Sequence, residues 1–257
     1  MKEKREAEAI PFRKISSDLA ASKEDINKVY VFSQTVLGEG HFGLVRKASL
    51  NYNSDRFYAV KTLKKEGNED QFHLMKRELE ILRSVDHPKI AKFYECYQDE
   101  KNFHFVIEYC GGESLVDKII KDRFIKENKV KRIFHDILSA VNHLHHRGIC
   151  HRDLKPDNFI FSDKGDKSAL KMIDFGLSKN YLTEELNSLV GTPYYVAPEL
   201  FSKQYDYKCD YWSLGCILYI MLVGKPPFYA KTDELIFQKI AKVDYNFNDE
   251  RWKSISP

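Results

Sequence analysis

The 257-residue chain lacks paired cysteines with metal spacing, a membrane-spanning stretch and the strong positive charge of nucleic-acid-binding proteins. Its five cysteines form no C-x-x-C pair, which favours reduced, mostly buried thiols in a cytoplasmic protein. The 41 lysines and arginines nearly balance 38 aspartates and glutamates, so charge gives no argument for nucleic acid. No membrane anchor is visible, because the most apolar stretch, residues 211–223, is too short to cross a bilayer. That stretch predicts a buried helix.

The apolar pattern predicts an α+β fold with two lobes. Residues 1–29 are charged and weakly periodic, and we expect a tail outside the main fold. The next part predicts a small, mainly antiparallel β lobe at 30–110 with one helix at 69–85. Residues 111–257 predict a larger, mainly α lobe, with helices near 130–144, 208–223 and 232–243. Clefts between lobes are favoured ligand sites.

A glycine-rich pattern lies between the first two expected strands. It reads Gly38-Glu39-Gly40-His41-Phe42-Gly43-Leu44-Val45. Glycines let a hairpin approach phosphates closely, but alone the pattern also fits an ordinary hairpin. A strand follows rather than a helix, which excludes a dinucleotide-binding βαβ unit.

A lysine on the third expected strand is the second candidate. Lys61 would reach phosphates if an acid held its ammonium group in place. The following helix offers Glu78 and Glu80, and burial of Leu79 and Leu82 would turn Glu78 toward the site. Without further motifs, a surface charge is the better interpretation of Glu78.

The most specific pattern is His151-Arg152-Asp153-Leu154-Lys155-Pro156-Asp157-Asn158. With the glycines and Lys61 it resembles the catalytic loop of the eukaryotic protein kinase superfamily. The resemblance implies transfer of the γ-phosphate of ATP to serine or threonine hydroxyls of protein substrates. Asp153 would orient the hydroxyl and accept its proton, Lys155 would stabilise charge on the moving group, and Asn158 would offer an oxygen to Mg²⁺.

The resemblance extends to Asp174-Phe175-Gly176, where Asp174 would bind the Mg²⁺ that bridges the phosphates. Phe175 would stack with His151, Leu82 and Phe93, and Asp210 would be buried against the catalytic-loop backbone. ATP and Mg²⁺ are the cofactors that this implies. The implied ATP-binding residues are Leu37, Gly38, Glu39, Gly40, His41, Phe42, Gly43, Leu44, Val45, Ala59, Lys61, Glu78, Ile107, Glu108 and Cys110. Either Glu113 or Ser114 would contact the ribose.

An activation segment would run from Asp174 to Ala197-Pro198-Glu199. It contains Thr183, Ser188 and Thr192. Lys155 and the stretch 191–195 resemble the serine/threonine type. One hypothesis is that a phosphate on Ser188 or Thr183 pairs with Arg152. The hypothesis that we favour, by resemblance to calcium-regulated kinases, is that Glu184 or Glu185 supplies the charge.

Four stretches, at 79–88, 174–179, 194–199 and 224–228, resemble the calcium/calmodulin-regulated branch, in particular the calcium-dependent kinases of protists and plants. The resemblance covers 30–257, and the family's later helices would then be missing. We therefore expect a partial second lobe, a buried Glu199 without its arginine, and a possible calcium-binding regulatory domain beyond Pro257. The alternative is a truncated or inactive fragment that acts as a nucleotide-binding or scaffold module.

Overall fold

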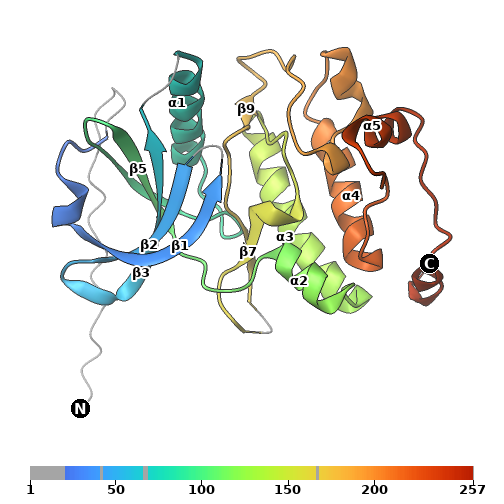
Figure 1. Cartoon of the computed structure of the whole chain (residues 1–257), viewed down its shortest axis with the longest axis horizontal. Coiled ribbons are helices and arrows are strands. Elements are labelled where there is room, and N and C mark those ends of the chain that lie inside the picture. The colour runs from blue at the N-terminus through green and yellow to red at the C-terminus, as the bar shows by residue number, and fades with distance from the viewer. Residues whose placement is uncertain (1–20, 41–42, 66–68, 166–167, 257) are drawn as a thin grey trace.

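The computed structural model describes residues 21–40, 43–65, 69–165 and 168–256, which form two lobes (Figure 1). The small lobe is a five-stranded antiparallel sheet in the order β1-β2-β3-β5-β4. Its elements are β1 (Tyr30–Gly40), β2 (Gly43–Leu50), β3 (Asn53–Lys64), α1 (Glu69–Ser84), β4 (Phe93–Gln98) and β5 (Asn102–Glu108). The predicted α+β class, with one α-helix beside an antiparallel sheet, is confirmed.

Helix α1 packs an apolar stripe against this sheet. Side chains three and four positions apart share one face of a helix, so the stripe sets the rotation of α1 and turns Glu78 toward β3. Phe72, the first member of the predicted stripe, is 41% exposed because it lies in the first turn. The buried members share a cluster with β5: Met75, Leu79 and Leu82 with Phe103 and Phe105.

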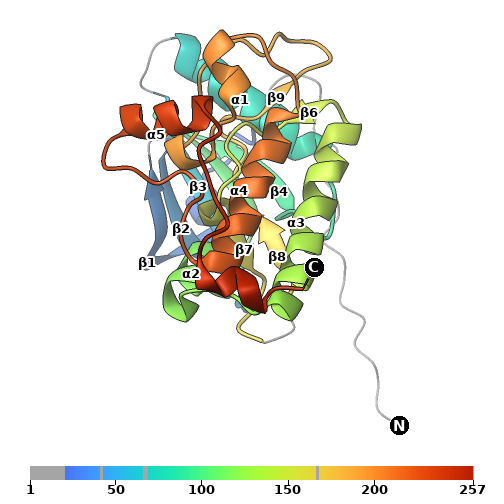
Figure 2. The same ribbon diagram turned by 90° about the vertical axis from the view of Figure 1, so that its right-hand side faces the viewer.

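The large lobe is mainly helical. Its elements are α2 (Leu115–Asp122), α3 (Glu127–His146), β6 (Ile149–Cys150), β7 (Phe159–Phe161), β8 (Leu170–Met172), β9 (Lys179–Asn180), α4 (Cys209–Val223) and α5 (Asp233–Ala241). Figure 2 shows α4 in the middle of the lobe beside α3, and ten of its 15 residues are buried. The stretch 211–223 is thus a core helix, as predicted. Among the described helices, none has the length and apolar character needed to cross a bilayer.

Backbone hydrogen bonds join the lobes next to the linker 109–114. The Ala91 amide donates to the Met172 carbonyl at 2.8 Å, and the Met172 amide donates to the Lys89 carbonyl at 2.9 Å. Strand β8 of the large lobe is therefore attached to the small lobe directly. This contact fixes the start of the activation segment relative to the sheet.

The expectation that residues 1–29 lie outside the fold is wrong for the described part, residues 21–29. Ser22 donates its amide to the Cys96 carbonyl and accepts from the Gln98 amide, which extends the edge of β4. Ala21 and Ile26 are buried at 8% and 5% exposure. The segment covers a sheet edge whose backbone groups would otherwise be unpaired.

Candidate active site

The hairpin of β1 and β2 carries the predicted glycines. Gly40 pairs with Gly43 across the turn, and His41 and Phe42 lie outside the described residues. Gly43 has a φ of +132°, and a Cβ there would stand 2.1 Å from the Thr62 carbonyl oxygen, so the fold requires glycine. A Cβ on Gly38 would meet nothing within 4 Å, which leaves the β1 backbone open to another molecule. The other predicted positions follow on the two strands: Leu37 and Glu39 on β1, Leu44 and Val45 on β2.

Lys61 on β3 binds acids from both lobes. Its Nζ lies 2.6 Å from Glu78 Oε1 of α1 and 3.0 Å from Asp174 Oδ1. Glu78 is therefore not a surface charge: it is 4% exposed and faces Lys61. The predicted choice of Glu78 over Glu80 is confirmed by this contact.

The charges of this triad are mutually dependent. Burial alone would lower the pKa of Lys61, but Glu78 and Asp174 outweigh burial and raise it above its usual value. Burial would raise the pKa of Asp174, but Lys61 outweighs burial and lowers it. For Glu78 burial prevails over Lys61, and the pKa rises. Lys61 thus stays protonated and Asp174 ionised at neutral pH.

Hydrogen bonds to α4 hold the backbone of the catalytic loop. Asp210, which is 1% exposed, accepts the His151 amide at 2.8 Å, the Arg152 amide at 2.9 Å and His145 Nε2 at 2.8 Å. Burial opposes its ionisation, but the His145 hydrogen bond and these donors lower the pKa of Asp210. The backbone role that the resemblance implied for Asp210 is confirmed.

Asp153 lies at the centre of the candidate site. Its Oδ1 accepts from the Thr192 hydroxyl at 2.8 Å, and its Oδ2 lies 2.8 Å from Lys155 Nζ. Lys155 also donates to Thr192 Oγ1 at 3.0 Å. Asn158 Nδ2 donates to the Asp153 carbonyl at 2.8 Å, which leaves its amide oxygen as a ligand atom. A carboxylate, an ammonium and a hydroxyl thus converge from the catalytic loop and the activation segment.

A family model described as the protein kinase domain matches residues 31–257. The chain belongs to this family. In three curated relatives the similarity covers most of this chain. Calcium-dependent protein kinase 3 of Plasmodium yoelii yoelii is 40% identical over 235 residues, 90% of this chain and 43% of that protein. Calcium-dependent protein kinase 5 of Plasmodium berghei is 38% identical over 243 residues, 94% of this chain and 43% of that protein. CDPK-related kinase 1 of Arabidopsis thaliana is 40% identical over 228 residues, 86% of this chain and 40% of that protein.

The predicted resemblance of this kinase domain to calcium-dependent kinases of protists and plants is confirmed by these relatives. The chain spans less than half the length of each of them. The activity, substrates and partners of the whole protein are therefore matters for proposal.

An aromatic contact joins the activation segment of the kinase domain to the catalytic loop. The rings of Phe175 and His151 lie 5.8 Å apart, and His151 Nε2 donates to the Asp174 carbonyl at 2.8 Å. Phe175, Leu82 and Phe93 belong to the same core cluster, as expected. His151 thus has a packing role, and the position of α1 is coupled to that of Asp174.

Strand β5 and the linker after it carry the residues predicted to lie beside the adenine ring. Ile107 and Ala59 lie opposite each other in the sheet, at 8% and 7% exposure. The Glu108 carboxylate accepts the Lys92 amide at 3.0 Å and pairs with Lys171 at 2.7 Å. At Cys110, burial and then the Glu108 charge raise the thiol pKa to about 12.

Both candidates for the ribose contact have partners within the protein. Ser114 caps α2 by accepting the Asp117 amide at 3.1 Å. Glu113 pairs with Lys118 at 3.3 Å and Lys121 at 3.5 Å. Neither contact excludes a ribose hydroxyl, so the choice stays a prediction.

The activation segment contacts α1 through an acid. Glu184 Oε2 lies 2.7 Å from Arg77 Nη2 and 3.6 Å from Lys179 Nζ. Arg152 instead donates Nε to the Leu177 carbonyl at 2.8 Å and Nη1 to the Tyr205 hydroxyl at 3.4 Å. The favoured hypothesis named Glu184 or Glu185 as the acid that supplies negative charge, and Glu184 does form an ion pair. Its partner is Arg77 of α1 and not Arg152. Sequence reasoning missed Arg77 because many surface helices carry such a charge.

The two candidate phosphorylation positions of the activation segment, Thr183 and Ser188, differ from its third hydroxyl residue, Thr192. Thr183 and Ser188 are exposed, whereas Thr192 is bound to Asp153 and Lys155. Glu199 was expected to be buried without compensation; it is only half-buried, so that expectation is wrong. Partial solvent contact reduces the cost of its charge.

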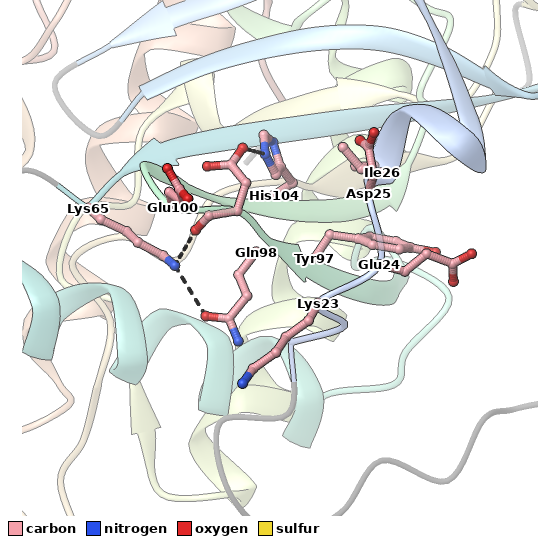
Figure 3. Close-up of a pocket in the computed structure, with 10 residues that line it drawn as sticks. Lys23, Glu24, Asp25, Ile26, Lys65, Tyr97, Gln98, Glu100 and His104 are labelled. Atoms are coloured by element: carbon pink, nitrogen blue, oxygen red, sulfur yellow. Dashed lines mark hydrogen bonds and ion pairs between the residues drawn. The ribbon is translucent and has the colours of Figure 1, made fainter.

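A cavity of about 420 Å³ lies in the small lobe, away from these residues (Figure 3). It includes His104, which bonds Thr62 at 3.0 Å and Asp99 at 3.0 Å. Thr62 follows Lys61 on β3, so their side chains point to opposite faces of the sheet. The cavity is therefore not part of the candidate active site. Its remaining lining comes from residues 23–26, 65 and 97–100.

Proposed function

We propose that the kinase domain is an ATP-dependent protein serine/threonine kinase that transfers the γ-phosphate of ATP to hydroxyls of protein substrates. The observation that carries the proposal is the Lys61 triad, in which one ammonium binds Glu78 of the small lobe and Asp174 of the large lobe. A structural ion pair needs only one acid. A lysine held between lobes by two acids suits phosphates that lie between those lobes.

The nucleotide binds between the glycine hairpin and the linker. Gly38 gives room for phosphates beside β1, and the small buried Ala59 faces Ile107, which would back the adenine pocket. Backbone groups near Glu108 and Cys110 face the adenine edge. Leu37, Glu39, Leu44 and Val45 of the hairpin would cover the phosphates, and the predicted contributions of His41 and Phe42 lie outside the described residues.

Two oxygen ligands fit a magnesium ion. Asn158 directs its NH₂ group at the Asp153 carbonyl, so its amide oxygen is free to face the phosphates, and Asp174 is ionised. Carboxylate and amide oxygens suit this hard cation. When bound, Mg²⁺ neutralises charge on the phosphates.

The transfer itself is assigned to the large lobe. Asp153 binds the substrate hydroxyl beside the Thr192 hydroxyl, since a carboxylate accepts several hydrogen bonds, and it accepts the substrate proton. Lys155 donates to the moving phosphoryl group. Thr192, retained beside them, aligns both side chains.

For substrate choice we propose basic serine/threonine segments, with the exposed Asp157 as a contact for an upstream arginine. The relatives are named calcium-dependent kinases, which supports a place in calcium signalling and a calcium-binding regulatory region in the intact protein. We place the kinase domain at residues 30–257, with the small lobe at 30–110 and the large lobe at 111–257. We also propose that the protein is cytoplasmic.

The decisive test is transfer of labelled γ-phosphate from ATP to a serine peptide by wild type and Asp153→Asn. We expect the variant to lose roughly a hundred- to ten-thousandfold in kcat, because it removes the proton acceptor. ATP affinity should change little, since Asp153 does not contact the nucleotide. Nucleotide binding by both proteins with no transfer by wild type would indicate a nucleotide-binding or scaffold module instead.

A further inference from the structure

Two buried cysteines that the proposed phosphotransfer does not use lie side by side in the large lobe. Cys150 ends β6 directly before His151, and Cys209 begins α4 directly before Asp210. Their sulfur atoms are 3.5 Å apart, although 59 positions separate them along the chain. In a disulfide the sulfurs stand about 2.05 Å apart, so a local shift of roughly 1.5 Å would join them.

The activation segment covers this pair. Both thiols are nearly inaccessible, at 0% and 3% exposure. The Cys209 thiol and burial raise the pKa of Cys150, so the covered Cys150 has little nucleophilic thiolate. Reaction therefore requires the cover to open. The cover consists of apolar residues in one cluster with the two sulfurs: Leu186, Val196, Ala197 and Leu200.

A metal ion is a poorer fit at the same place. The two sulfurs and a carboxylate oxygen of Asp210 lie within 4.8 Å of one another. However, both Asp210 oxygens already accept buried hydrogen bonds from the catalytic loop and His145. A metal that bound Asp210 would have to break these bonds. If the bonds are kept, only the two sulfur atoms remain as ligands.

We propose that Cys150 and Cys209 form a reversible disulfide when a peroxide reaches them through the opened activation segment. One sulfur attacks the peroxide and breaks its O–O bond, which gives a sulfenic acid and one water molecule. The second sulfur displaces the sulfenic oxygen, which leaves as a second water. The two thiols supply two electrons and their two protons end in water. A dithiol reductant reverses the reaction by exchange.

The new bond would tie the residue before His151 to the residue before Asp210. The backbone next to the catalytic loop must shift to bring the sulfurs together, which displaces Asp153 from its contacts with Lys155 and Thr192. We therefore expect oxidation to suppress phosphotransfer. This consequence rests on the proposed kinase activity, whereas disulfide formation does not.

The test is peptide mapping of the 257-residue chain after treatment with hydrogen peroxide under native conditions. We expect one linked peptide pair containing Cys150 and Cys209, lighter by two hydrogen atoms, which disappears with dithiothreitol. Leu186→Ala should form it roughly tenfold faster, because the cover is weakened. No such pair after exhaustive treatment, or preferential linkage of Cys96, Cys110 or Cys216, would overturn the proposal.

Activity on the same samples separates the two claims. Oxidised wild type should lose phosphotransfer and regain it with reductant, whereas Cys209→Ala should not respond. Cys216→Ala is the matched control, since Cys216 is also buried on α4 but lies in a different cluster. A mapped disulfide with unchanged turnover contradicts the regulatory role. If reduced wild type shows no phosphotransfer, the proposed function is contradicted. The peptide mapping of wild type still shows whether the disulfide forms.

Discussion

The catalytic loop and the activation segment lie against each other but are held by contacts of different kinds. In the loop, His151, Arg152 and Asp153 are at most 9% exposed, and buried Asp210 accepts two of its backbone amides. In the segment, Glu184 pairs with Arg77 of α1, and the side chains of Arg77 and Glu184 are 26% and 32% exposed. Buried hydrogen bonds fix a geometry, whereas half-exposed ion pairs are weak and adjustable. The proposed chemistry thus depends on buried contacts within the large lobe, and the proposed control depends on a more exposed contact between the lobes.

Removing the buried anchor should have the largest effect. Asp210→Asn keeps the shape but leaves His145 and two amides with weaker acceptors, and we expect a loss of about 3 to 5 kcal/mol in unfolding free energy. The pKa of Asp210 is lowered in the fold, so its contribution is present above about pH 4 and is lost as the pH falls through the folded value. The variant should therefore show a flatter stability curve below about pH 4 in urea titrations.

The matched control for that variant is Asp206→Asn, an exposed aspartate of the same lobe. It should change unfolding free energy by less than about 0.5 kcal/mol. Equal effects of the two substitutions would contradict the distinction between fixed and adjustable regions.

The contact between the two regions should affect turnover more than stability. Thr192→Val keeps the size of the side chain but removes the hydroxyl that bonds Asp153 and Lys155. Hydrogen bonds to charged groups contribute about 1.5 to 3 kcal/mol, so a misaligned Asp153 should lower kcat roughly ten- to hundredfold, with a smaller effect on the melting temperature because Thr192 is only partly buried. Thr192→Ser should retain most of the turnover. An unchanged kcat in the valine variant would show that Thr192 only packs there.

The ion pair of the segment should have a smaller effect. Glu184→Gln weakens the link from the segment to α1, and we expect a two- to fivefold loss of kcat, since exposed pairs contribute roughly 0.2 to 1 kcal/mol. Exchanging the charges in Arg77→Glu with Glu184→Arg should restore part of it. Measurement of the two single variants and the double variant gives the coupling energy. Additive losses would mean that the pair does not hold α1.

The smallest expected effect concerns phosphorylation. Because Glu184 already pairs with Arg77, Thr183→Ala and Ser188→Ala should each leave the kcat of unphosphorylated protein unchanged. Mass spectrometry would establish the absence of phosphate before the assay. Strict dependence of activity on a phosphate at either position would favour the alternative that Arg152 needs such a partner.

The sequence predicted the parts of the site that local patterns encode. Burial of Leu79 and Leu82 at helical spacing, together with the other motifs of the family, selected Glu78 as the partner of Lys61. The contacts that were missed join segments far apart in the chain, such as Arg77 with Glu184 and Cys150 with Cys209. These pairs have no periodic signal, because the first depends on how the segment lies against α1 and the second on how β6 packs against α4.

The docking of residues 21–29 was missed for a related reason. Ser22 pairs with β4 through backbone groups, which carry no side-chain pattern. Its charged neighbours Lys23 to Asp25 are exposed, so composition indicated a solvated tail. A covered sheet edge is thus harder to predict than a covered helix face.

Amide hydrogen exchange under native conditions tests the contrast most directly. The His151 and Arg152 amides, bound to Asp210, should exchange only by global unfolding, roughly a thousandfold or more slower than the Leu182 and Glu184 amides of the segment. Arg77→Met should speed exchange in the segment alone. Similar rates in the two regions, or acceleration of both by this substitution, would contradict the account.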